Sequence, residues 1–378
     1  MKRIRVLQFP VANSKGGITQ YILQNWKFID KSKFQFDFAT MSKSLDFAGD
    51  LEKEGCRIHY IPCYAEQDEE RFKYEFRKIL LEGNYDIVHL HTKQWKSFLV
   101  EQIAKDVGVK KIIIHAHSTG IDTLDKERRK EEIQLHNKVL ESLTEEIATD
   151  YWTCSWKAAE FIFGDKIPKE KIRRMNNAID VQKFKFSQKT RNKYRKELGV
   201  LDSFVIGNVG RFVYQKNQEF LLEVFRQLCL KESNFKLLLV GSGEREKEYR
   251  DFVNGNGLEE KVIFAGQRAD VNCLLQAMDC FCFPSRFEGL GIALIEAQAT
   301  GVKCICEEQV PQEALISQDI DFLPCVLELW VDKISQYATG DWAEYHVRRR
   351  DAWIQIEQSG YGVVGQIKSV EKGYEYGI

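Results

Sequence analysis

Short apolar segments alternate with longer amphipathic segments along most of the chain. The apolar segments, rich in branched and aromatic residues, predict buried strands, and the amphipathic segments predict helices. Predicted strands in the first half cover residues 4–9, 34–39, 57–61, 86–91, 111–115 and 151–155, with helices at 18–28, 46–54, 66–82, 95–107 and 122–148. Predicted strands in the second half cover residues 204–209, 235–240, 261–264, 279–283 and 303–306, with helices at 218–230 and 290–299. This alternation predicts an α/β fold in which parallel sheets are covered by helices on both faces.

The length of 378 residues predicts two domains. Residues 166–196 carry twelve Lys and Arg residues against two acidic ones, and we place the domain boundary in this segment, near residue 184. The first domain then covers residues 1–184 and the second covers residues 185–352. A basic linker of this kind is usually only solvated, but one that opens onto a cleft adds positive potential for a diphosphate.

The segment 279–301 is the most informative part of the sequence. An apolar strand ends at Pro284, Gly289 and Gly291 predict a turn around Leu290, and a helix rich in Ala, Leu and Ile runs on to Gly301. Free backbone N–H groups and the helix dipole both point at such a turn. The pattern therefore predicts a site for an anion.

Glu288 and Glu296 stand at the start of this helix and two turns into it. Eight helical residues rise by roughly 12 Å, whereas a carboxylate pair that hydrolyses a glycoside is about 5–9.5 Å apart. The two acids therefore fit opposite ends of a long ligand with an anionic middle, such as a nucleoside diphosphate sugar. The alternative is that both are ordinary solvated acids.

Further glycines and cations follow other predicted strands of the second half. Because the carboxyl ends of parallel strands meet at one edge of a sheet, these residues are expected to lie at that edge. They are Gly210, Arg211, Lys216, Gly241, Gly266 and Arg268. Arg211 and Lys216 are spaced to clamp two phosphates beside the helix near residue 290.

In the first half, Gly16 and Gly17 follow the first strand, and His89, His91, His115 and His117 lie at the ends of two later strands. The histidines fit hydrogen bonding to a substrate hydroxyl or phosphate, or an ordinary structural role. A metal site is disfavoured because no acidic cluster accompanies them, and because His pairs on adjacent strands need not converge.

Composition excludes some classes of protein. The net charge of −1 argues against nucleic-acid binding by the whole chain. The ten Cys residues include no C-x2-C pair, so buried free thiols and a reducing compartment, the cytoplasm, are expected. No apolar run reaches the length of a membrane span. The basic run from Lys126 to Lys130 fits a solvated face, or contact with the phosphates of a membrane-bound substrate.

Taken together, the motifs resemble those of the retaining glycosyltransferases of family 4, which have the GT-B fold. The resemblance is closest to the enzymes that build bacterial exopolysaccharide, capsule or O-antigen chains. Its most specific part is Glu288-x7-Glu296 within residues 283–299, joined in family order by the segments Gly16-Gly17, 115–118, 177–180, 210–216 and 262–266. The sequence departs from the family pattern at Ala178, at Asn217, where Gly is common, and at Glu307-Glu308.

The resemblance implies two Rossmann-like domains with a cleft between them, and a C-terminal helix, about residues 353–378, that crosses back onto the first domain. It implies catalytic roles for Arg211, Lys216, Glu288 and His117. Arg211 and Lys216 would hold the diphosphate, Glu288 would face the donor sugar, and His117 would lie by the donor sugar and acceptor. The implied donor-binding residues are Gly16, Gly17, Gly210, Gly241, Gly266, Arg268, Gly289, Leu290, Gly291 and Glu296, with Glu296 on the ribose hydroxyls.

The implied activity is transfer of a hexose or N-acetylhexosamine from a nucleotide diphosphate sugar, with UDP favoured, to a glycan or undecaprenyl-diphosphate-linked acceptor. The resemblance implies no metal and no other cofactor, and a cytoplasmic enzyme with room for peripheral contact with the cell membrane. Two other functions stay open at this point: a GT-B nucleotide-sugar epimerase, and a non-catalytic subunit that binds the donor. The donor base, the sugar and the acceptor are not fixed by these residues.

Overall fold

The computed structural model describes residues 3–13, 16–231, 234–340, 345 and 347–377. The chain divides into two compact units. The first contains Met1–Ile121, Glu127–Asn177 and Val363–Ile378, and the second contains Asp122–Lys126 and Ala178–Gly362. Ile378, the last residue of the predicted C-terminal helix, lies outside the described residues.

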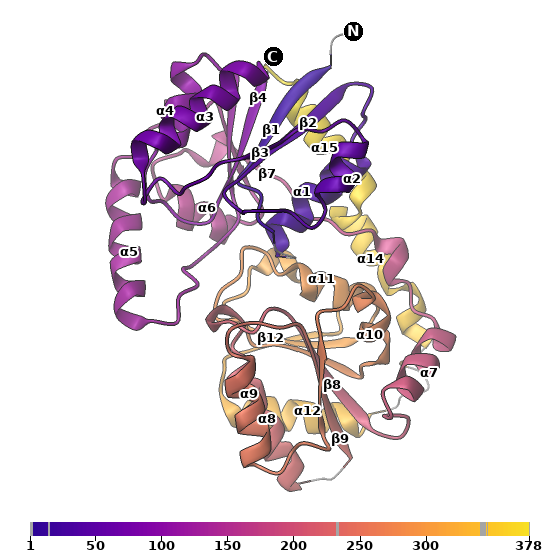
Figure 1. Ribbon diagram of the computed structural model, residues 1–378. Helices are drawn as coiled ribbons and strands as arrows, with labels where there is room; N and C mark the ends of the chain where they lie inside the picture. Colours follow the sequence, from indigo (N-terminus) through magenta and orange to yellow (C-terminus); the bar gives the residue numbers. More distant parts are fainter. Residues whose placement is uncertain (1–2, 14–15, 232–233, 341–344, 346, 378) are drawn as a thin grey trace. The chain divides into compact units, whose positions relative to one another are not determined.

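The first unit is built on a parallel sheet with strand order β3-β2-β1-β4-β5-β6-β7 (Figure 1). Its strands are β1 Ile4–Phe9, β2 Phe34–Thr40, β3 Ile58–Tyr60, β4 Ile87–Thr92, β5 Lys111–Ala116, β6 Asp150–Thr153 and β7 Ile172–Arg174. Its helices are α1 Gly17–Phe28, α2 Ala48–Lys53, α3 Glu69–Gly83, α4 Leu99–Asp106, α5 Lys126–Glu141, α6 Trp156–Phe163 and α15 Val363–Glu375. The register pairs His91 with His115, so the two strands that carry histidines run level with each other.

The C-terminal helix α15 packs on this first unit, as expected. Figure 1 shows it, in yellow, beside α1 in indigo, and the two helices are in contact. Ile367, Val370 and Tyr374 enter the same core as Val6 and Phe36 from the sheet. A segment from the far end of the sequence therefore completes the core of the N-terminal unit.

The second unit is built on a parallel sheet with strand order β10-β9-β8-β11-β12-β13. Its strands are β8 Phe204–Val209, β9 Phe235–Val240, β10 Val262–Gly266, β11 Cys280–Phe283, β12 Lys303–Glu307 and β13 Ile320–Leu323. Its helices are α7 Gln188–Glu197, α8 Gln218–Lys231, α9 Glu246–Gly255, α10 Val271–Ala277, α11 Ile292–Ala299, α12 Leu327–Ala338 and α14 Ala352–Ile356. The predicted two parallel sheets with interleaved helices are confirmed.

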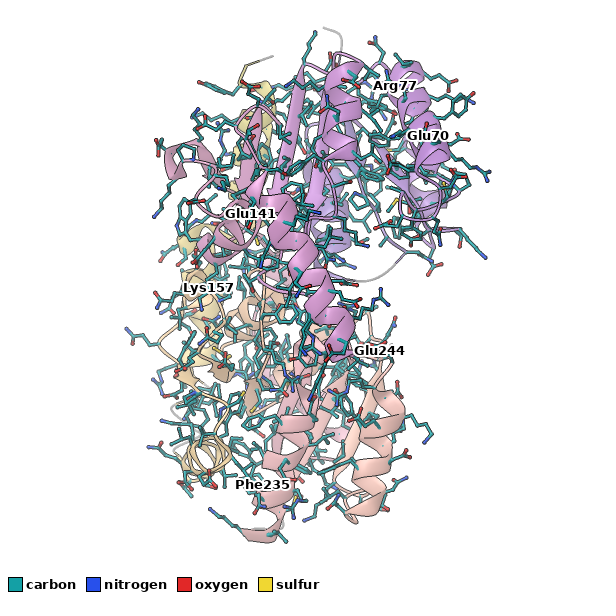
Figure 2. The ribbon with its side chains drawn as sticks, turned by 90° about the vertical axis from the view of Figure 1, so that its left-hand side faces the viewer. Glu70, Arg77, Glu141, Lys157, Phe235 and Glu244 are labelled. Atoms are coloured by element: carbon teal, nitrogen blue, oxygen red, sulfur yellow. The ribbon has the colours of Figure 1, made fainter. Side chains whose placement is uncertain are left out.

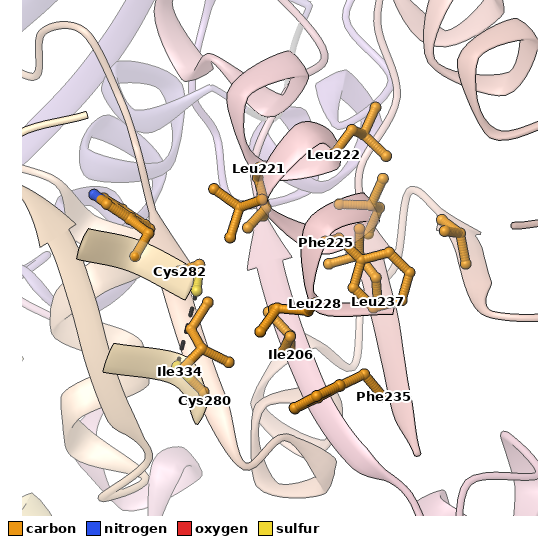
Figure 3. Packing of buried hydrophobic residues seen from close by; sticks show 14 of the residues in the cluster. Ile206, Leu221, Leu222, Phe225, Leu228, Phe235, Leu237, Cys280, Cys282 and Ile334 are labelled. Atoms are coloured by element: carbon orange, nitrogen blue, oxygen red, sulfur yellow. Dashed lines mark hydrogen bonds between the residues drawn. The ribbon is translucent and has the colours of Figure 1, made fainter. Parts of the chain in front are cut away.

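The core of the second unit lies between the sheet and helices α8 and α12 (Figure 3). Leu221, Phe225 and Leu228 of α8 and Ile334 of α12 pack there against the strands. Cys280 and Cys282 both point into this core, with their Sγ atoms 3.8 Å apart and unoxidised. Both thiols lie on the same side of β11 because alternate residues of a strand share one face, and the expected buried free thiols are found at these two positions.

The expectation that the basic segment 166–196 is only a solvated linker is wrong at two positions. Arg191 and Arg195 lie one turn apart on α7, are buried, and both bind the buried carboxylate of Asp279 at the start of β11. The Arg195 Nη1–Asp279 Oδ2 distance is 2.8 Å. These cations anchor α7 to the second unit, because a buried charge needs a partner, and they are not available for a diphosphate.

Candidate active site

Two loops at the carboxyl edge of the second sheet bring Lys216 and Glu288 together. Lys216 precedes α8, Glu288 lies between β11 and α11, and Lys216 Nζ is 2.5 Å from Glu288 Oε1. Both side chains are largely buried, at 16% and 7% exposed. Charges this secluded are screened less by salt than a surface pair, and the structure holds this cation and anion in one preformed position.

Gln215 extends this pair and was missed in the sequence analysis. Its side-chain Nε2 donates to the Phe287 main-chain carbonyl at 2.9 Å and to Glu288 Oε2 at 3.3 Å. The main-chain carbonyl of Gln215 accepts from the Arg286 main-chain amide. A glutamine beside a predicted clamp carries no distinctive sequence signal. Its role becomes visible only once the two loops are placed side by side.

Arg211 lies near this pair in sequence but has a different partner. Its guanidinium donates to Asp122 Oδ2 at 3.1 Å, and the other Asp122 oxygen accepts from the Gln215 amide at 3.1 Å. The Arg211 side chain is half exposed. Asp122 lies in the short segment Asp122–Lys126, which is part of the second unit although it precedes most of that unit in the sequence. Asp122 was not among the predicted site residues.

Gly210, Gly241 and Gly266 end three adjacent strands and are joined through their backbones. The Gly210 amide donates to the Val240 carbonyl, and the Gly241 amide donates to the Gly266 carbonyl at 2.9 Å. Gly241 has φ +141°, and a Cβ there would lie 1.9 Å from the Gly210 carbonyl oxygen. Only glycine fits that position, so the loop that carries Lys216 can approach the sheet edge closely.

The turn before α11 differs in one respect from the prediction. Gly291 adopts a left-handed φ of +96° and caps the helix, so α11 begins at Ile292 instead of near Leu290. Glu288, Gly289 and the buried Leu290 are therefore not helical. The 12 Å spacing expected for Glu288 and Glu296 assumed a continuous helix and does not apply.

Glu296 lies on α11 and is only partly exposed. Its carboxylate makes no hydrogen bond or ion pair with any residue that the structure describes. Burial raises the pKa of this carboxyl from 4.5 to about 7. A partly exposed acid at a predicted ligand site, without a partner among the described residues, is the pattern expected of a binding group whose partner is the ligand.

Arg268 makes no contact with Arg211, Lys216 or Glu288 among the interactions of the described residues. Its guanidinium forms a two-point contact with Asp270, at 2.6 and 2.7 Å. Asp270 also accepts from the Tyr194 hydroxyl. Arg268 therefore has a local partner that a phosphate would have to displace.

In the first unit, Gly16 caps the start of α1 and Gly17 is its first residue. His117 follows β5 and is buried, at 8% exposed. The expectation that the paired histidines need not converge is wrong: His91 Nδ1 is 3.0 Å from His117 Nε2, and His89 Nε2 is 3.1 Å from His115 Nδ1. Nitrogens of His89, His91 and His115 lie within 4.8 Å of one another.

A separate cavity of about 550 Å³ opens at the carboxyl ends of β11, β12 and β13. Its lining residues are Asn217, Glu219, Phe220, Arg286, Glu307 and Cys325. Glu219 and Arg286 pair across it at 2.7 Å. Apart from Asn217, which adjoins Lys216, this lining is distinct from the predicted site.

A comparison with known sequences shows what part of this chain is similar to. Residues 190–319, which include β8 to β12 and both loops of the Lys216–Glu288 pair, match the family described as glycosyl transferases group 1. This segment is similar to the group 1 glycosyltransferases. This glycosyltransferase is 28% identical over 313 residues to EpsF of Bacillus subtilis (strain 168), named as a glycosyltransferase, with 82% of this chain and 80% of EpsF covered.

Two further likenesses extend over most of the chain. The capsular polysaccharide biosynthesis glycosyltransferase CapH of Staphylococcus aureus is 29% identical over 301 residues, covering 78% of each chain. The crystal structure of Anabaena HepE in complex with UDP-glucose superposes with a TM-score of 0.78 at 19% identity, covering 98% of this chain and 99% of HepE. At this identity the structural likeness shows the fold, and the predicted GT-B fold is confirmed.

Helix α5 begins with the basic run from Lys126 to Lys130, for which a solvated face or contact with a membrane-bound substrate was expected. Within this helix His136 is the one buried residue, and Figure 2 shows side chains standing out around it up to the labelled Glu141. Arg128 pairs with Glu132 and Lys130 with Glu127 on the same helix. None of the described helices combines the length and the apolar character that crossing a membrane requires.

Proposed function

We propose that this glycosyltransferase moves a hexose or N-acetylhexosamine from a UDP-sugar to a glycan or lipid-linked sugar, with retention of configuration, in bacterial surface polysaccharide synthesis. The observation that carries the proposal is the buried Lys216–Glu288 pair at the sheet edge of the group 1 domain. The donor is supported by HepE, whose structure holds UDP-glucose. The pathway is supported by CapH, whose name assigns it to capsular polysaccharide.

The proposed chemistry uses the charges at this edge. The leaving diphosphate binds between Lys216, Arg211 and the amides before α11, which stabilise the negative charge as it develops. To receive it, Lys216 shifts from Glu288 towards a phosphate and Arg211 leaves Asp122. Glu288 then accepts hydrogen bonds from hydroxyls of the donor sugar, and Glu296 does the same for the ribose.

Retention follows if the acceptor hydroxyl attacks on the face from which the diphosphate leaves. The acceptor oxygen forms a bond to the anomeric carbon as the bond to the diphosphate oxygen breaks. The acceptor proton passes to that departing oxygen, so the step is balanced without a covalent sugar–enzyme bond. Two cations and backbone amides supply the positive charge, so no metal is required in this scheme.

The first test is binding of donors to the purified chain. Ligand at one hundred times its Kd adds about 2.7 kcal/mol of stability, so a UDP-sugar should raise Tm clearly above equal concentrations of GDP- and ADP-sugars. The second test is product analysis with a glycan acceptor. An anomer-retained glycoside supports the proposal, whereas conversion of the donor sugar without any acceptor product contradicts it and identifies an epimerase.

A further inference from the structure

Four histidines of the first unit form one buried hydrogen-bonded circuit at the ends of β4 and β5. The circuit also contains a glutamine from β1 and a tyrosine from α15, and all six side chains are at least nine-tenths buried. Its members are Gln8, His89, His91, His115, His117 and Tyr374. Parallel, level strands place these alternate residues on one face of the sheet.

One branch of the circuit runs from Gln8 to His117. His91 Nε2 is 2.8 Å from the Gln8 carbonyl oxygen, which only accepts, so His91 carries its proton on Nε2. The bare Nδ1 of His91 then accepts from His117 Nε2–H at 3.0 Å. His117 is left with an unprotonated Nδ1.

The other branch runs from Gln8 through Tyr374. Gln8 Nε2 donates to the Tyr374 hydroxyl at 3.0 Å, and that hydroxyl donates to His89 Nδ1 at 2.7 Å. His89 is therefore protonated on Nε2 and donates to His115 Nδ1 at 3.1 Å. His115 is left with an Nε2–H.

We propose that Gln8 is a positioning residue that fixes all four histidines as Nε2–H tautomers, so that His117 presents an unprotonated Nδ1 to a hydroxyl of the sugar substrate. The hydroxyl then donates to His117. The part of this inference that concerns substrate rests on the proposed function, whereas the assignment of the tautomers does not.

The two ends of the circuit support a ligand at this place. His117 Nδ1 and His115 Nε2 are buried and have no hydrogen-bond partner among the residues that the structure describes. Leaving a buried polar atom unpaired destabilises a protein, and native proteins seldom keep one without a function. One end is an acceptor and the other is a donor, and their rings are 4.0 Å apart between centroids. A hydroxyl group can both donate and accept, so it suits this pair.

The surroundings keep every ring neutral. Burial lowers the pKa of His89, His91 and His115 well below the usual value, and lowers the pKa of His117 to about 3. The ring of Tyr21 stands edge-on to His115 at 5.1 Å, and Trp152 closes the side next to His89 at 5.0 Å. A neutral imidazole has one donor and one acceptor, which is the condition for a single path of hydrogen bonds.

The circuit allows two arrangements. If the Gln8 amide were turned over, every hydrogen bond would reverse, all four rings would carry the proton on Nδ1, and His117 would offer a donor. A mixture of tautomers is incompatible with both arrangements. A metal ion on His89, His91 and His115 would replace the bonds to Gln8 and Tyr374.

The tautomers can be read directly from the full-length protein labelled with ¹⁵N-histidine. Long-range ¹H–¹⁵N spectra distinguish Nε2–H from Nδ1–H rings, and single His→Asn variants assign the signals. The expected result is an Nε2–H pattern for His89, His91, His115 and His117, unchanged by EDTA. An Nδ1–H pattern, a mixed pattern, or a metal-dependent change at His89, His91 and His115 overturns the proposal.

Two variants separate the branches. Gln8→Met keeps the side-chain length but removes both polar groups, and it should release all four histidines from their Nε2–H pattern. Tyr374→Phe removes one hydroxyl and should release His89 and His115 alone. A loss of all four patterns in Tyr374→Phe, with the protein still folded, would show that Tyr374 orients the circuit instead of Gln8.

Kinetics then test whether Gln8 acts through His117. A lost hydrogen bond of ordinary strength lowers kcat/KM for transfer by about ten-fold, and Gln8→Met should show this loss. Added to His117→Ala, the same change should have almost no further effect, because its target is gone. Equal losses in both backgrounds overturn the positioning role. If no UDP-sugar is transferred by the unmodified protein, the proposed function fails and the spectra still decide the tautomers.

Discussion

Asn217 donates from its side-chain amide to the main-chain carbonyl of Pro284, with Nδ2 and O 3.1 Å apart. Each residue adjoins one loop of the Lys216–Glu288 pair: Asn217 follows Lys216, and Pro284 follows β11 on the way to Glu288. This bond therefore holds the two loops at a fixed separation. The same Asn217 has a left-handed φ of +55°, a conformation that glycine adopts freely and asparagine tolerates.

We predict that Asn217→Ala is more destabilising than Asn217→Gly. Alanine loses the bond to Pro284 and is also strained at positive φ, for a total of about 2 kcal/mol. Glycine loses the bond alone, for about 1 kcal/mol. Urea unfolding of the three proteins measures the order. Alanine at least as stable as glycine would show that the backbone conformation is not a constraint.

Lys216→Ala is predicted to abolish most transfer. Removing one preorganised donor from a developing oxyanion lowers the rate by about 10²–10³-fold, and initial rates with a UDP-sugar measure it. Lys247→Ala is the matched control, because Lys247 is 87% exposed and pairs with Asp251 on the surface. Transfer by folded Lys216→Ala at the control's rate would remove Lys216 from the mechanism.

Gly241→Ala should displace the loop that carries Arg211 and Lys216, because the added methyl group meets the backbone of Gly210 at the start of that loop. The new methyl group would lie 1.9 Å from the Gly210 carbonyl oxygen at a backbone φ of +141°, so the loop has to move. We expect a loss of roughly 2–3 kcal/mol in the free energy of unfolding and a fall in transfer.

Gly255→Ala provides the control for this glycine. Gly255 is the last residue of α9 and does not have a positive φ. Among the described residues, no atom beyond its chain neighbours and its own helix backbone lies within 4 Å of the place that an added methyl group would take. There the same change should be neutral or stabilising by up to about 1 kcal/mol. A Gly241→Ala protein as stable and active as Gly255→Ala contradicts the close packing.

Much of the fold is readable from the sequence because strands such as β1, β8 and β11 are continuous apolar runs, which predict buried parallel strands. The glycines at 210, 241 and 266 were found for the same reason, since each ends such a run. In contrast, β13 was missed: it is short, only partly buried and includes Asp321. A strand at the edge of a sheet gives little apolar signal.

Pairings between distant segments could not be predicted. Arg191 and Arg195 look like surface cations until Asp279, more than eighty residues later, is placed beside them. The convergence of His91 and His117 depends on the register of β4 with β5, which one sequence does not determine. Asp122 and Gln215 have no distinguishing pattern at all. Sequence therefore indicates which residues belong to a strand end, while the structure determines which of them meet.

The pKa of Glu296 gives a prediction about pH. This carboxyl has a pKa of about 7 in the folded protein and 4.5 in the unfolded reference. Between these values the unfolded chain loses the proton first, so the unliganded protein is destabilised as pH rises from about 4.5 to 7, and that stability does not return above pH 7. Glu296→Gln should abolish this contribution, on the order of 2 kcal/mol, as measured by urea unfolding at pH 5 and pH 7.5.

Binding of UDP-glucose should have the opposite dependence on pH. An ionised carboxylate accepts hydrogen bonds from both ribose hydroxyls, so affinity rises as pH increases through 7, and Glu296→Gln should remove that rise. Glu101→Gln is the control, because Glu101 on α4 is buried and its pKa is likewise raised to about 7, but it belongs to the first unit and is not a predicted ribose contact. It should relieve the same loss of stability and leave the pH dependence of binding intact. Calorimetric titrations of the three proteins separate the cases: if Glu296→Gln keeps the rise in affinity, a group other than Glu296 binds the ribose.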